Sequence, residues 1–147
     1  MEKNYKKSEE ILAEIYRNSQ LALQSISNIL PETGDEELKQ EILRQHEEYE
    51  RISARASVIA KNKGIELKEP NPIKKAMMWG SIKMNAMKDG SRSHIAEMMV
   101  QGTVMGITAL KSSASDASEV GDDEVWALLN EFIELEEGFE RKLKEYL

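Results

Sequence analysis

The chain has 147 residues, a formal net charge of −7 and no cysteine. This length suits one domain with a hydrophobic core, and the lack of cysteine excludes disulfides, thiolate metal sites and thiol catalysis. The acidic charge disfavours nucleic acids and anionic membranes as partners, because both repel a negatively charged protein. We find neither a secretion signal nor an apolar run long enough to span a bilayer, and we expect a cytoplasmic protein.

The composition predicts an all-α protein with a single domain over residues 1–147. Good helix formers such as Glu, Lys, Ala, Leu and Met dominate, whereas alternating runs of β-branched and aromatic residues are missing. There are only three prolines and eight glycines, and the prolines lie with Gly34, Gly64, Gly90 and Gly121 at the edges of long periodic segments. This spacing favours a few long helices over many short elements.

The first predicted helix runs from Ser8, its N-cap, to Leu30, where Pro31 stops it. Apolar residues recur on one of its faces at helical spacing. This stripe consists of Ile11, Ile15, Ala22, Ile26 and Ile29. The pattern predicts that one face of the helix is buried.

The second predicted helix begins at one of two caps and ends at Lys63. Asp35 is one candidate N-cap, and a capping box formed by Thr33 and Glu36 competes with it. Gly64 follows the helix, at the position where a left-handed glycine commonly ends one. The short turn before this helix predicts that the first two helices are antiparallel neighbours.

The third predicted helix lies within a long connection, residues 65–91. Proline disfavours helix in the preceding residue, so we expect extended chain over residues 65–71, with Asn71 as cap and Pro72 in the first helical position. The sequence Asp-Gly-Ser at residues 89–91 breaks this helix.

The last two helices are predicted over residues 93–111 and from residues 121–124 to residue 147, with a polar loop over residues 112–120. The helix at 93–111 is so apolar that only a narrow strip can face water, which makes it the central element. The apolar stripe of the last helix is Val125, Leu128, Leu129, Phe132, Leu135, Phe139 and Leu143.

The order of these segments has the connectivity of a four-helix bundle with one helical crossover. Two antiparallel helices are followed by the crossover at residues 65–91 and then by two more helices. The chain resembles the ferritin-like superfamily in this respect over most of its length, and in particular small bacterial members related to rubrerythrin-type bundles. A five-helix bundle in up-and-down order uses the same segments and remains the alternative.

The ferritin-like resemblance implies a site for two iron or manganese ions. Such sites use one inward Glu on each of two helices and a Glu-x-x-His motif on each of the other two. Neither motif is intact here, because Leu43 stands three residues before His46, and Phe139 stands three residues after Glu136. The candidate metal ligands are Glu14, Glu48, His94, Glu97 and Glu136.

Three of these candidates have further support from their positions in the sequence. His94 and Glu97 are three residues apart, so both can reach one divalent ion from one helix face. Glu136 lies inside an apolar stripe, where its charge must be paired, protonated or bound. The competing interpretations are a solvated helix face for His94 and Glu97, and a boundary residue paired with Lys or Arg for Glu136.

Methionine is concentrated in one part of the chain. Seven of the eight methionines lie between residues 77 and 105, in the third and fourth predicted helices. Flexible thioethers can fill a core, line an apolar groove or bind a soft metal ion such as Cu(I).

The sequence therefore supports a leading hypothesis and two alternatives. The leading hypothesis is a non-enzymatic ferritin-like bundle that acts through self-association, as a homo-oligomer, or through a protein partner, with no catalytic residue assigned. The first alternative is a divergent oxidoreductase or metal-handling protein that uses iron or manganese. The second alternative is a methionine-lined groove that binds an apolar molecule or a soft metal ion.

Overall fold

The computed structural model describes residues 2–68, 72–117 and 123–147. Helices account for every regular element in these residues, and no strand occurs among them. The elements are α1 (Glu2–Ile29), η1 (Leu30–Glu32), α2 (Glu36–Lys63), α3 (Pro72–Lys88), α4 (Arg92–Ala117) and α5 (Asp123–Lys144). The prediction of an all-α protein is confirmed.

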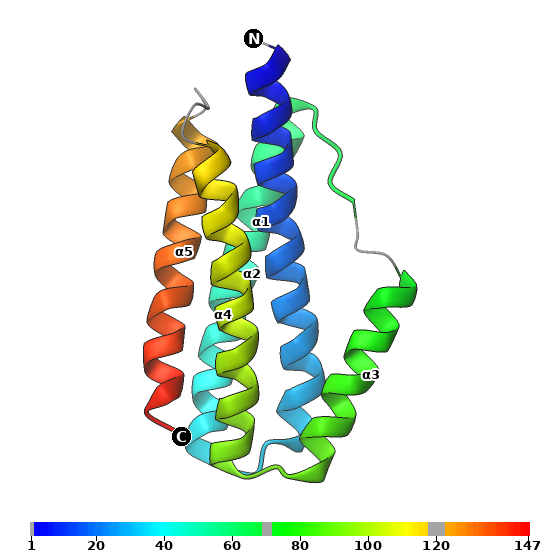
Figure 1. Cartoon of the computed structure of the whole chain (residues 1–147), viewed down its shortest axis with the longest axis vertical. Helices are drawn as coiled ribbons and strands as arrows, with labels where there is room; N and C mark the ends of the chain where they lie inside the picture. The colour runs from blue at the N-terminus through cyan, green and yellow to red at the C-terminus, as the bar shows by residue number, and fades with distance from the viewer. Residues whose placement is uncertain (1, 69–71, 118–122) are drawn as a thin grey trace.

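The long helices α1, α2, α4 and α5 stand side by side, and the shorter α3 is tilted against them (Figure 1). Along the bundle, α1 is antiparallel to α2 and α4 is antiparallel to α5, whereas α2 and α4 run in the same direction (Figure 1). The main packing pairs are α1 with α2, α4 and α5, and α5 with α2 and α4. Helix α3 packs mainly on α1 and covers one side of the bundle.

The ends of α2 are formed by local interactions that the sequence predicts. The side chain of Asp35 accepts a hydrogen bond of 2.8 Å from the backbone N–H of Leu38, which confirms Asp35 as the N-cap. At the other end, Gly64 has a left-handed φ of 68° and the N–H of Ile65 donates to the carbonyl of Ala60. This arrangement is the predicted glycine C-cap.

Helix α1 begins earlier than predicted, at Glu2 instead of Ser8. Ser8 is buried inside the helix, so its assignment as the N-cap is wrong. Residues 2–7 contain neither proline nor glycine, so nothing in their sequence stops the helix from extending through them.

The bounds of α3 agree with the prediction, and its end is fixed by a close contact between two turns. The carbonyl of Gly90 accepts a 3.0 Å hydrogen bond from the N–H of Gly34, which joins the α3–α4 turn to the α1–α2 turn. A Cβ atom on Gly90 would lie 2.2 Å from the carbonyl oxygen of Glu32, so only glycine fits there. The predicted cap Asn71 lies outside the described residues.

Helix α4 is longer than predicted and continues to Ala117. The predicted polar loop is therefore wrong for residues 112–117, while residues 118–122 lie outside the described part of the chain. Alanine favours helix and serine opposes it only weakly, and Ala114 gains packing against the core from this extension.

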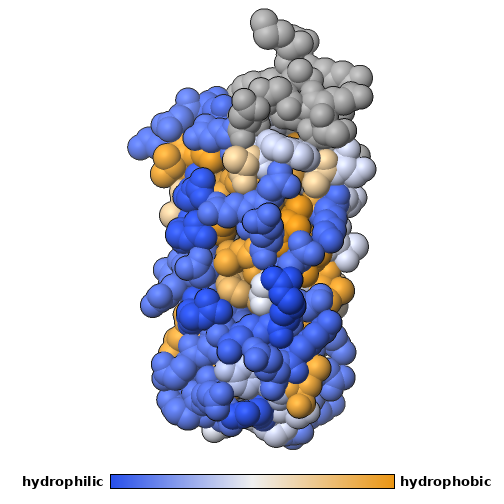
Figure 2. Space-filling view, turned by 90° about the vertical axis from the view of Figure 1, so that its left-hand side faces the viewer, coloured by the Kyte–Doolittle hydropathy of each residue, from blue (hydrophilic) through white to orange (hydrophobic). Residues whose placement is uncertain are grey.

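The core runs the length of the bundle and consists of the apolar stripes of α1, α2, α4 and α5. Its largest fully buried side chains include Leu12, Ile15, Ile42, Ile52, Ile95, Leu128 and Phe132. The side of the molecule that carries α5 is mostly hydrophilic, with hydrophobic residues showing in a band between the polar ones (Figure 2). None of the described helices is long and apolar enough to cross a membrane.

Candidate functional site

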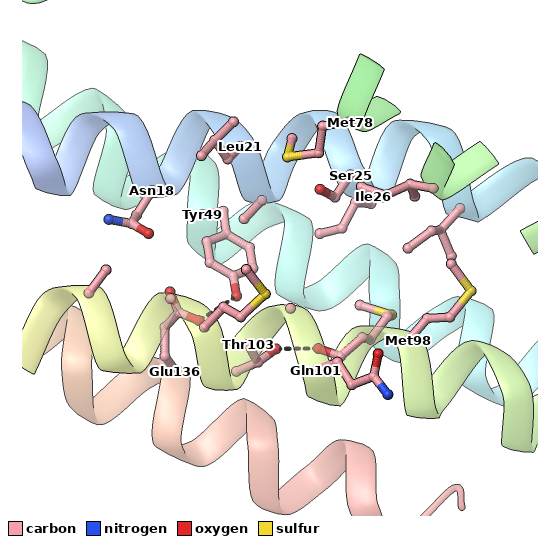
Figure 3. A pocket seen from close by; sticks show the side chains of 18 of the residues that line it. Asn18, Leu21, Ser25, Ile26, Tyr49, Met78, Met98, Gln101, Thr103 and Glu136 are labelled. Atoms are coloured by element: carbon pink, nitrogen blue, oxygen red, sulfur yellow. Dashed lines mark hydrogen bonds between the residues drawn. The ribbon is translucent and has the colours of Figure 1, made fainter. Parts of the chain in front are cut away.

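A cavity of about 510 Å³ lies between α1, α3 and α4. Its volume is within the range typical of small-molecule sites, roughly 300–1,000 Å³. Its apolar wall includes Leu21, Ile26 and Ile29 of α1, Met78 and Ile82 of α3, and Met98 of α4. Several of these side chains, together with the polar residues among them, are shown in Figure 3.

The cavity exists because two helix faces that line it carry small residues at helical spacing. On α1, Ala22 and Ser25 face the space, and on α4 Gly102 and Gly106 do so. A Cβ atom on Gly102 would meet nothing within 4 Å, which shows that the wall is open there. Small residues at these positions leave room that longer side chains would fill.

A buried hydrogen bond forms the polar part of the inner wall. The Tyr49 hydroxyl, from α2, donates to Oε2 of Glu136, from α5, over 3.1 Å (Figure 3). Tyr49 is 3% exposed and Glu136 is 2% exposed, yet both line the cavity. The packing of α2 against α5 thus brings together two groups that are 87 positions apart in the sequence.

Burial raises the pKa of both members of this pair. Burial raises the pKa of Glu136 to about 8, and the hydrogen bond from Tyr49 lowers it by less. Burial also raises the pKa of Tyr49 well above its ordinary value, and the neighbouring Glu136 raises it further. At neutral pH Glu136 is therefore mostly a neutral carboxylic acid, which can both donate and accept hydrogen bonds.

The other carboxylate at the cavity is Glu14 of α1. It forms an ion pair with Arg17, and its Oε1 accepts a 2.9 Å hydrogen bond from Nδ2 of Asn18. All three residues line the cavity, and Arg17 is about half exposed, with 47% of its side chain accessible. The Glu14–Arg17 ion pair therefore lies at the edge of the cavity, and its two charges neutralise each other.

The remaining candidate metal ligands lie away from the cavity lining. Glu48 pairs with Arg51 at 2.8 Å, and Nε2 of His94 lies 3.0 Å from the backbone carbonyl oxygen of Asn85. Glu97 is exposed. Of the five predicted residues, the structure therefore brings Glu14 and Glu136 to one cavity and does not bring the other three to it.

The described residues contain no group of three or more His, Asp or Glu side chains arranged to hold a metal ion. The set of five metal ligands stays a prediction that the geometry of the cavity does not support as a whole.

The methionines divide into two groups. Met78, Met98, Met99 and Met105 line the cavity, whereas Met77, Met84 and Met87 of α3 are exposed. Met105 is itself 73% exposed, so it lies at the mouth of the cavity.

Sequence reasoning missed the role of Tyr49, which reads as one apolar position in the stripe of α2. The signal that was present is its hydroxyl group, because a tyrosine in a buried stripe usually needs a hydrogen-bond partner.

No protein-family model matches this chain, and no curated protein is similar to it. Its function must therefore be argued from the cavity itself.

Proposed function

We propose that this protein binds a small, largely apolar molecule in the cavity between α1, α3 and α4. The observation that carries the proposal is the combination of an apolar wall with the single buried Tyr49–Glu136 pair. Apolar pockets with a few convergent polar groups and a perturbed pKa are the usual form of small-molecule sites. This is the second alternative derived from the sequence, now attached to particular residues.

The test is a titration with the neutral fluorescent dye prodan, whose emission reports an apolar environment. The variant Ser25→Phe places a large side chain in the cavity, because Ser25 lines it. Ser27→Phe is the matched control, since Ser27 is an exposed residue of the same helix and does not line the cavity. We expect the wild type and Ser27→Phe to bind the dye and Ser25→Phe to lose binding. Equal binding by both variants would refute the proposal.

The connectivity favours a ferritin-like form of the bundle. The parallel direction of α2 and α4, joined by a long connection that carries α3, is the arrangement that a crossover produces (Figure 1). In this interpretation Glu14 and Glu136, both at the cavity, correspond to inward carboxylates. These two carboxylates support the alternative of a divergent iron or manganese protein.

Self-association remains the second candidate function, because an exposed row of methionines lies on α3. Met77, Met84 and Met87 are 73%, 65% and 63% exposed, and their spacing places them on one face of the helix. Light scattering over a concentration series tests it. Met84→Lys should lower the association, whereas Val58→Lys, at an exposed apolar position on α2, should not. A monomer at all concentrations would exclude self-association.

A further inference from the structure

The side chains along the cavity indicate where the polar head group of a ligand would lie. Glu136 and Tyr49 lie together towards one end of the row of side chains in Figure 3, and Met98 lies towards the other. A ligand with a polar head and an apolar chain can place its head at Glu136 and its chain towards Met98, which has Gln101 as a polar neighbour (Figure 3). The question is then which charge the polar end carries.

Glu136 lacks the positive partner that a buried carboxylate normally has. Its pKa is raised by burial and lowered only by the hydrogen bond from Tyr49, and no lysine or arginine among the described residues acts on it. Buried carboxylates are usually paired with a cation, because an unpaired one is costly to keep ionised. A cation carried by a ligand would fill this role.

The other groups that face the cavity do not supply or oppose such a cation. Arg17 and Glu14 of α1 form an ion pair with each other, so their charges are balanced. The polar residues that α3 and α4 contribute to the wall are uncharged, and they are Ser81, Asn85, Gln101 and Thr103. Glu136 is therefore the carboxyl group at the cavity whose charge, when ionised, a cationic head group could balance and an anionic one could not.

The opposite end of the cavity suits a flexible hydrocarbon chain. Ile26 and Met98 lie towards this end (Figure 3). A methionine side chain adapts to the shape of its neighbour because it is unbranched and polarizable. This end can therefore accept an alkyl chain without a precise shape.

We propose that the cavity takes a small amphiphile with a primary amine head, and that its ammonium group pairs with the carboxylate of Glu136 while its alkyl chain lies among the methionines. This inference rests on the proposed function, since it names the chemical class of ligand for the same cavity. Binding at neutral pH requires Glu136 to release its proton to solvent, while the amine keeps its own.

The experiment compares three ligands that share one alkyl chain: decylamine, decanol and decanoic acid. Isothermal titration of the full-length protein at neutral pH gives the affinity of each. In the wild type we expect decylamine to bind most tightly and decanoic acid least. Glu136→Gln should weaken decylamine about thirtyfold or more, because it removes one member of a buried charge pair, and should change decanol by less than about threefold.

Glu134→Gln is the matched control, since Glu134 is an exposed residue of the same helix. It should leave all three affinities as in the wild type. Repeating the decylamine titration in two buffers of different ionisation enthalpy measures the proton released on binding. This measurement needs no variant, so it holds even if Glu136→Gln is unstable.

The outcomes separate the two proposals. If decanol binds while decylamine has no advantage and releases no proton, the amine inference is wrong and the apolar cavity remains a binding site. If Glu136→Gln and Glu134→Gln weaken decylamine equally, Glu136 does not hold the head group. If none of the three ligands binds, both proposals fail.

Discussion

A Cβ atom on Gly106 of α4 would lie 2.9 Å from Oε1 of Glu136 on α5. The buried carboxyl therefore fits against α4 only because position 106 has no side chain. Helices α4 and α5 pack closely, and this contact fixes where the carboxyl can lie. The position of Glu136 at the cavity thus depends on the packing of α4 against α5 as well as on its own side chain.

Adding a methyl group at position 106 should destabilise the protein. We expect Gly106→Ala to lower the free energy of unfolding by about 1–3 kcal/mol, because the methyl group overpacks the carboxyl. Gly102→Ala is the control, since its Cβ would meet nothing within 4 Å. It should stabilise the helix by up to about 1 kcal/mol. Urea denaturation measures both, and a shift of the same sign in the two variants would contradict this account.

The stability of the protein should depend on pH through Glu136. Its folded-state pKa of about 8 lies above the ordinary value of 4.5, so the folded protein holds this proton more firmly than the unfolded chain does. The resulting stability is present below pH 4.5 and is lost as the pH rises towards 8. The slope is at most about 1.4 kcal/mol per pH unit.

Glu136→Gln isolates this contribution, because glutamine resembles the protonated acid and does not titrate. The difference in unfolding free energy between Glu136→Gln and the wild type should increase with pH across this window. Chemical denaturation at a series of pH values measures it. Parallel curves for the two proteins would show that Glu136 titrates normally.

Removing the Tyr49 hydroxyl should both weaken the fold and shift this pH dependence. Tyr49→Phe leaves Oε2 of Glu136 without the hydrogen bond from Tyr49, which should cost about 1–3 kcal/mol. The hydrogen bond lowers the pKa of Glu136, so its loss should move the pH dependence to higher pH. Unchanged stability and unchanged pH dependence would assign Tyr49 a packing role only, because the variant keeps the ring that contacts Phe132 and Phe139.

The metal content of the protein remains to be measured. The leading hypothesis from the sequence predicts no stoichiometric metal and a defined oligomer. Elemental analysis of protein purified without an affinity tag and without added metal, together with light scattering, tests both points. A monomer with tightly bound iron or manganese would reverse that hypothesis, and Glu14 and Glu136 would then be the first residues to substitute.

The parts of the fold that could be predicted are those with a local signal in the sequence. Asp35 and Gly64 form the caps of α2 through their own side chain and backbone, and Pro72 begins α3 by its fixed φ angle. The start of α1 and the end of α4 have no such residue. Their bounds depend on how much packing each additional turn gains, and that is a property of the whole bundle.

The candidate site was predictable only in part for the same reason. Glu136 stood out because a carboxylate in an apolar stripe is unusual, and Glu14 because it borders the stripe of its helix. Tyr49 did not, since an aromatic residue fits a core position without further explanation. The cavity itself could not be predicted, because it depends on the tilt of α3 against α1, which helical periodicity does not contain.

Because of the way it is attached, α3 should resist local unfolding less than the four long helices do. The four long helices bury their stripes against one another, whereas α3 packs mainly on α1 and has three methionines exposed on one face. We expect the amide hydrogens of α3 to exchange with solvent faster than those in the middle of α1 and α5, as measured by hydrogen–deuterium exchange. The wall of the cavity that α3 supplies would then open without unfolding the rest of the protein.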